Sequence, residues 1–210
     1  MRTVPVNDNS SHLFRYLSAV LFEWLLLGAS MAGLYRRREF FELAFTTRAW
    51  SLVRSLRLGI AVYLAGFLTI GLVGGALYFT PLFHRRNQAV ILALMPRTPS
   101  ELAAWLFVSL TAGLCEELIF RGYLLQQLSA WTKRPVAAIV LTGVLFGCLH
   151  LYEGVAAVFP LAALGILYGF VVRRSHGDLR AVILAHTLQD FLVAFIPLAR
   201  PFLERYNPHA

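Results

Sequence analysis

The chain has 210 residues, of which 58% are hydrophobic and only 14% charged; its mean hydropathy is +0.65 and its formal net charge is +8. Soluble domains of this size are usually about 45–50% apolar and about 25% charged. Because the excess falls into runs long enough to cross a bilayer, about 20 residues each, the composition excludes an ordinary soluble domain and indicates a polytopic membrane protein.

The positive charge does not indicate a nucleic-acid partner. Basic residues cluster at the ends of apolar runs, where anionic headgroups and membrane topology account for them. No basic stripe or RNA-binding aromatic pattern accompanies them. The two cysteines, Cys115 and Cys148, lie in apolar runs without CxxC or zinc spacing, and we expect them to be packing residues.

The first apolar run, about 16–35, contains the acidic residue Glu23. The segment Ser30-Met31-Ala32 resembles a signal-peptide cleavage site. However, the run is nearly 20 residues long and three arginines follow it at 36–38, which is a stop-transfer pattern. We therefore expect an uncleaved span, with Glu23 near a partner or an interface and of little functional weight.

Six apolar runs predict membrane spans at about 16–35, 58–79, 101–129, 135–152, 155–172 and 180–199. Between the second and third, the stretch Pro81–Pro99 has an apolar core at 89–95 that is too short to cross. It predicts an interfacial or re-entrant piece, which would raise the count to seven or eight. The third span begins well for a helix, with Ser100 as its expected cap. The predicted fold is an all-α, polytopic transmembrane helical bundle that encloses an intramembrane polar cavity.

The third run contains two adjacent glutamates, Glu116 and Glu117, followed by Arg121. Each ionised side chain at the centre of a membrane helix costs roughly 2.5–3.5 kcal/mol. Glu117 and Arg121 are four residues apart, which favours an ion pair on one helical face. Glu116 is rotated by about 100° from that face. Glu116 is therefore the carboxylate that we expect to be free for general-base chemistry.

Two later runs add further polar groups at helical spacing. Phe146 and His150 are four residues apart, as are His186 and Asp190, so each pair shares a face. Such residues should face a protein-lined or wet cavity and not lipid. Each also has a simpler structural interpretation: an ion pair for Glu117, or an interhelical hydrogen bond for either histidine. A purely structural role is less well supported for all of these residues together, because three helices each contribute polar side chains that are costly to bury.

The three patterns Glu116-Glu117-x-x-x-Arg121, Phe146-x-x-x-His150 and His186-x-x-x-Asp190 resemble, in this order, the motifs of the CPBP family. These are the CAAX prenyl protease and bacteriocin-processing proteins, also called the ABI family of intramembrane endopeptidases. The resemblance covers about residues 101–195. It divides the chain into N-terminal helices with a connecting segment (1–100), a CPBP-like catalytic core (101–199) and a C-terminal tail (200–210).

The resemblance implies peptide-bond hydrolysis inside a membrane cavity, in the cytoplasmic (inner) membrane of a prokaryote. Glu116 and His150 would activate a water, His186 and residue 190 would stabilise the oxyanion, and Glu117 and Arg121 would hold the helix, with Phe146 as structural support. The family's third motif commonly ends in Asn, whereas this chain has Asp190. An ionised aspartate would repel an oxyanion, so we expect Asp190 to orient and charge His186.

Other chemistries and roles stay open. No cofactor is expected, but Glu116, His150 and His186 could form a zinc site with one open position. From other classes, the chain could be a noncatalytic scaffold or immunity-type partner, or a proton-coupled carrier that uses the same buried groups. A carrier would favour paired half-helices or internal symmetry, which the sequence lacks. The expected partners are the bilayer and a membrane-embedded or membrane-adjacent peptide, and prenyl specificity does not follow.

Overall fold

The computed structural model describes residues 12–35, 51–81 and 94–195, and these residues form helices. The six long helical segments are α1 (Leu13–Tyr35), α3 (Leu52–Tyr78), the continuous run α5 (Pro99–Glu117), η2 (Leu118–Leu124) and α6 (Leu125–Thr132), then α7 (Pro135–Leu149), α8 (Val155–Arg174) and α9 (Arg180–Val193). A short 3₁₀ turn, η3 (Leu151–Glu153), joins α7 to α8. The prediction of an all-α chain is confirmed. Most of the expected re-entrant piece lies outside the described residues.

Four of the described helices are long and apolar enough to cross a bilayer: Leu13–Ala32, Leu52–Tyr78, Pro99–Thr132 and Val155–Arg174. They indicate an integral, multi-pass membrane protein. α7 and α9 have 15 and 14 residues, fewer than the roughly 20 that a span needs, so the expected count of six spans stays a prediction. Large apolar side chains on α1 and α3 are exposed, among them Leu17, Leu21, Leu68 and Leu72, which suits surfaces in contact with lipid.

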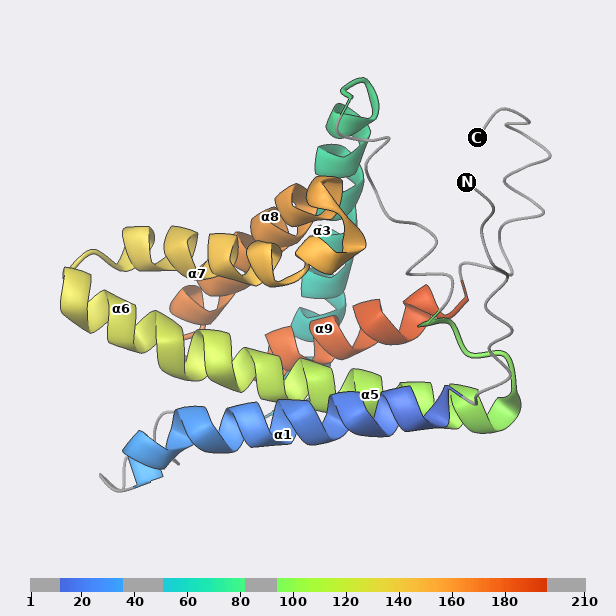
Figure 1. Cartoon of the computed structure of the whole chain (residues 1–210). Helices are drawn as coiled ribbons and strands as arrows, with labels where there is room; N and C mark the ends of the chain where they lie inside the picture. The colour runs from blue at the N-terminus through green and yellow to red at the C-terminus, as the bar shows by residue number, and fades with distance from the viewer. Residues whose placement is uncertain (1–11, 36–50, 82–93, 196–210) are drawn as a thin grey trace.

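Figure 1 shows α1 running alongside α5, with α9 behind α5 and the steeply inclined α3 behind α9. α8 packs against both α3 and α7. The main apolar core lies where these helices meet, and it includes Leu27, Val62, Cys115, Phe146, Leu164, Tyr168 and Val182. A side chain that points inward from α5, α7 or α9 therefore enters the same interior.

The start of α5 differs from the prediction in its capping residue. Thr98 is the N-cap and its hydroxyl accepts the Glu101 N–H at 3.2 Å, whereas Ser100 lies within the helix. Pro99 at the first helical position explains the shift, because its fixed φ suits that position and it lacks an N–H. The Glu101 carboxylate accepts the His12 main-chain N–H at 3.1 Å, and this bond ties the start of α1 to the start of α5.

The long α5–α6 helix contains a π-helical stretch, η2, directly after Glu117. π-Helical turns are rare and are found frequently at functional sites. No residue pattern in the sequence predicted it. Arg121 lies in the middle of this stretch and yet stays within reach of Glu117, so the wider turns preserve the pairing expected from helical spacing.

α7 and α8 approach each other closely through glycines. A Cβ at Gly165 would lie 2.9 Å from the Gly143 Cα, 3.1 Å from the Gly143 carbonyl oxygen and 3.2 Å from Arg121 Nη2. Any side chain at position 165 would therefore push α7 away and displace the arginine. The glycine leaves its own carbonyl oxygen accessible to Arg121, and this contact links the crossing of α7 and α8 to the interior of the bundle.

Asp178, in the loop between α8 and α9, holds the first turn of α9. Its carboxylate accepts the Arg180 main-chain N–H at 3.0 Å and binds the Arg180 guanidinium at 2.9 and 2.7 Å. The side-chain hydrogen bond from Arg180 lowers the pKa of Asp178 below its usual value. A carboxyl group with a depressed pKa stabilises the folded state above its unfolded pKa of about 3.9, and this stabilisation is lost as the pH falls through the folded pKa.

We therefore expect Asp178→Asn to lower the free energy of unfolding by about 0.5–1 kcal/mol at neutral pH. The difference between variant and wild type should shrink as the pH falls below about 4. Thermal unfolding in detergent, followed by circular dichroism over this pH range, measures both. A variant as stable as wild type at every pH would show that these bonds contribute no net stability.

Candidate active site

The centre of the site is an ion pair that is fully enclosed by protein. Arg121 Nη1 donates to Glu117 Oε1 at 2.7 Å, and the two side chains are 1% and 0% exposed. Arg121 Nη2 also donates to the Gly165 carbonyl oxygen at 3.1 Å. The guanidinium carbon lies 4.7 Å from the centre of the Phe146 ring and 5.4 Å from that of Tyr168. The arginine therefore joins η2 to α8 and packs against α7.

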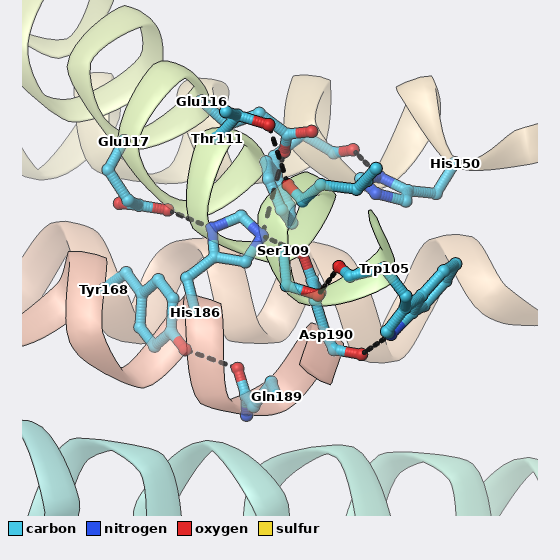
Figure 2. Close-up of polar contacts among 12 residues, drawn as sticks. Trp105, Ser109, Thr111, Glu116, Glu117, His150, Tyr168, His186, Gln189 and Asp190 are labelled. Atoms are coloured by element: carbon cyan, nitrogen blue, oxygen red, sulfur yellow. Dashed lines mark hydrogen bonds and ion pairs between the residues drawn. The ribbon is translucent and has the colours of Figure 1, made fainter. Parts of the chain in front are cut away.

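His186 is the residue on which the carboxylates converge (Figure 2). Its Nδ1 lies 2.9 Å from Glu117 Oε1, and its Nε2 lies 3.5 Å from Asp190 Oδ2 and 3.9 Å from Glu116 Oε2. The 2.9 Å contact is a hydrogen bond, and it requires a proton on Nδ1 because the Glu117 oxygen can only accept. Glu117 thus sets the orientation of the ring, and Nε2 faces Glu116 and Asp190.

This geometry adds a second contact to the one expected of Glu117. From the sequence, Glu117 was assigned to Arg121 alone, and Asp190 was expected to orient and charge His186, a role that stays a prediction. In the structure, Glu117 makes the hydrogen bond to His186 while Asp190 lies at ion-pair distance from the other ring nitrogen. The bond links residues 69 positions apart, so helical spacing could not reveal it.

The predicted span 135–152 placed His150 inside a helix, but in the structure His150 follows the last residue of α7. α7 ends at Leu149, and His150 is its C-cap with Nδ1 2.8 Å from the Phe146 carbonyl oxygen. The carbonyls of the last helical turn lack partners within the helix, and the imidazole satisfies one of them. The turn that follows is closed by Gly154, whose φ of 102° suits only glycine well. His150 is thereby held at the end of α7 with Nε2 uncommitted to that bond.

Glu116 is half-buried, unlike its neighbour Glu117. Its Oε2 atom is buried and, among the described residues, has no hydrogen-bond partner. No hydrogen bond or ion pair among the described residues joins Glu116 directly to His150. Figure 2 places His150 on the opposite side of His186 from Glu117. A buried carboxylate oxygen without a partner calls for a water or a ligand.

Sequence reasoning missed several residues around this cluster. The Trp105 indole N–H donates to the Asp190 main-chain oxygen at 3.0 Å, and the Tyr168 hydroxyl donates to Gln189 Oε1 (Figure 2). Trp105 and Tyr168 sit in apolar helices as ordinary core residues would, so the sequence offered no signal for them. Gln189 could have been predicted as a neighbour of the cluster, because it directly precedes Asp190 in the sequence.

Glu23 is a further neighbour of the cluster. It belongs to α1, yet it lies beside Thr111 on α5 and close enough to Glu116, Asp190 and His186 for their charges to influence it. The expectation that Glu23 lies near a partner or an interface, with little functional weight, stays a prediction. The signal in the sequence was its presence as the only acidic residue in the first apolar run.

The alternative zinc site has no support in the geometry of the described residues. They contain no group of three or more His, Cys, Asp or Glu side chains placed to hold a metal ion. Glu116, His150 and His186 are all described, and they do not form such a group. Glu116 and His186 approach each other to 3.9 Å, a distance at which two ligands of one ion can lie, but His150 does not complete the set.

The fold and the cluster together define a class: a multi-pass helical membrane protein with carboxylates and histidines buried between helices. Residues 98–192 match the family model described as type II CAAX prenyl endopeptidase Rce1-like. The match begins at the cap of α5 and ends within α9, so it includes Glu116, Glu117, Arg121, Phe146, His150, His186 and Asp190 and leaves out α1 and α3. No curated protein and no solved structure matches the chain.

The family match confirms the resemblance found in the three motifs. It is a protease family, which indicates protease activity and therefore a protein or peptide as the substrate. The buried pairs of glutamate and histidine are consistent with that activity.

Proposed function

We propose that this protein is an intramembrane endopeptidase in which Glu116 activates a water. The observation that carries the proposal is the buried, unpartnered Oε2 of Glu116 beside His186, whose orientation Glu117 sets. A candidate general base needs a free acceptor within reach of the proton that it removes. The three motifs meet in this cluster although α5, α7 and α9 are distant in sequence.

In the proposed reaction, the water oxygen bonds to the carbonyl carbon of the scissile peptide while one of its protons passes to Glu116. The tetrahedral intermediate then collapses, the carbon–nitrogen bond breaks, and Glu116 returns the proton to the leaving amine. The products are a new C-terminal carboxylic acid and a new N-terminal amine, and transfer of the remaining proton between them gives a carboxylate and an ammonium group. His150, fixed by its bond to Phe146, would hold the water from the other side.

The oxyanion requires a donor, and His186 is suited to provide it. Its Nδ1 is occupied by Glu117, so an imidazolium would direct the N–H on Nε2 towards the developing charge. Asp190 lies 3.5 Å from Nε2 and would balance the charge of this imidazolium before a substrate arrives. Substrate binding would then replace Asp190 by the carbonyl oxygen as the partner of Nε2. The role of Asp190 would thus differ from that of the Asn that commonly ends this motif, because a neutral amide would itself donate to the oxyanion.

The class of substrate follows from the setting. The four long apolar helices and the surrounding core favour a peptide segment within or next to the bilayer. A lipid-modified C-terminus, a leader peptide and a sorting segment all fit this description. The intramembrane polar cavity that would admit the segment is part of the proposal.

The test is a mass-spectrometric comparison of peptide termini in membrane fractions from cells with wild type, Glu116→Gln or Asp178→Asn. Asp178 is a matched control because it is a carboxylate at the end of a helix outside the cluster. The proposal expects new termini with wild type and Asp178→Asn and none with Glu116→Gln at matched expression. If termini are identical in all three while deletion of the protein still has a phenotype, the scaffold or carrier role replaces the protease.

A further inference from the structure

The inner face of α1 is apolar apart from one acidic side chain. Tyr16, Leu27 and Met31 are buried on this face, whereas Leu21 and Phe22 are exposed. Glu23 is half-buried, and α1 packs along α5 (Figure 1). A carboxylate between membrane helices is costly to bury. Its position between α1 and the reaction site therefore needs a compensating reason.

The surroundings of Glu23 are those of the reaction site. It lies close enough to Glu116 and Cys115 on α5, and to His186 and Asp190 on α9, for these groups to influence one another electrostatically. Its Oε2 atom is buried and, among the residues that the structure describes, has no hydrogen-bond partner. The same is true of Glu116 Oε2. Two neighbouring carboxylates thus each retain one buried acceptor that no protein donor satisfies.

A water molecule has two protons to donate, which matches two unsatisfied acceptors. Building on the proposed function, we propose that Glu23 is a positioning residue that accepts a hydrogen bond from the attacking water while Glu116 takes its other proton. The oxygen lone pair of the water is then directed away from both carboxylates, towards the peptide carbonyl. Glu23 itself neither gains nor loses a proton in this step, so the balance of the hydrolysis is unchanged.

Thr111 on α5 lies beside the Glu23 side chain, and its hydroxyl donates to the Val108 carbonyl oxygen at 2.9 Å on the same helix. α1 and α3 lie outside the family match at residues 98–192. Helix α1, which lies outside the matched residues, would therefore contribute the Glu23 side chain to the reaction of the matched segment.

The experiment measures steady-state cleavage of the substrate found by terminus profiling, using the full chain in detergent. The variants are Glu23→Gln, Glu23→Asp and Thr111→Val, and Ser18→Ala is the control because this exposed hydroxyl of α1 donates to the Phe14 carbonyl oxygen of its own helix. We expect Glu23→Gln to lower kcat by about 10- to 100-fold with little change in KM, because an amide oxygen is a weaker acceptor than a carboxylate and the amide can present its NH₂ group to the water instead. Glu23→Asp and Thr111→Val should show smaller losses, and Ser18→Ala none.

A merely structural role for Glu23 would change the amount of active protein without changing the pH dependence of its rate. If Glu23 acts at the site, its replacement by Gln removes an ionisable group beside Glu116, and the pH dependence of the rate should change. His186 and Asp190 on α9 and Cys115 on α5 are the other titratable groups facing Glu23, and all are retained in the variant.

The outcomes separate this inference from the proposed function. An unchanged rate and profile in Glu23→Gln, with Glu116→Gln inactive, would overturn the positioning role and leave the protease intact. A lower yield of folded protein with an unchanged profile would also overturn it. Activity retained in Glu116→Gln would remove the proposed function and this inference together.

Discussion

Replacing His186 by asparagine is expected to lower the rate of peptide cleavage by about 10²- to 10³-fold, the loss typical of removing one oxyanion donor. The asparagine amide nitrogen can take the place of the imidazole Nδ1 and keep the bond to Glu117 Oε1. It has no counterpart of Nε2, the atom that faces Glu116 and Asp190. The substitution therefore removes the chemical role while it retains the structural one.

The matched control is His176→Asn. His176 is exposed in the loop after α8, and its φ of 56° is a conformation that asparagine tolerates well. This variant should cleave at the wild-type rate. The measurement is single-turnover cleavage at matched protein concentration, with thermal unfolding to confirm equal stability. Full activity in His186→Asn would show that Nε2 takes no part in the reaction.

Replacing Arg121 by methionine should be the most destabilising single change considered, at about 3–5 kcal/mol. Methionine fills a similar volume, but it leaves Glu117 buried without its ion-pair partner and the Gly165 carbonyl oxygen without its donor. Unfolding in detergent with increasing denaturant measures the loss. The exposed residue Arg173 offers the control, because Arg173→Met should change stability by less than about 0.5 kcal/mol.

A double variant separates the stability of the pair from its function. In Arg121→Met with Glu117→Leu the buried charges are both gone, and most of the stability should return. Activity should not return, because His186 Nδ1 has lost the acceptor that orients it. If the double variant cleaves as well as wild type, Glu117 acts on the fold alone.

Local patterns predicted local geometry well. The length and hydropathy of the runs predicted the helices, and the four-residue spacing predicted the contact of Glu117 with Arg121 and the proximity of His186 to Asp190. These two side-chain contacts depend only on the turn of about 3.6 residues in an α-helix. The ends of helices were less accurate, since α7 stops at Leu149 where His150 and Gly154 turn the chain.

Contacts between helices could not be predicted from spacing. The bond from His186 to Glu117, the reach of Arg121 to Gly165 and the approach of Glu23 to the cluster each depend on how separate helices pack. The π-helical stretch after Glu117 likewise has no signature in its residues. The roles of the site residues themselves stay predictions, because geometry identifies neighbours and kinetics must assign their chemistry.

The ion pair between Glu117 and Arg121 also bears on how the chain enters the bilayer during synthesis. The two residues are on one helix, one turn apart, whereas Gly165 and His186 follow much later in the chain. The α5–α6 segment can therefore leave the translocon with these two charges already neutralising each other, before α8 and α9 have been made. Lateral release of this helix into lipid does not have to wait for the partners that later complete the site.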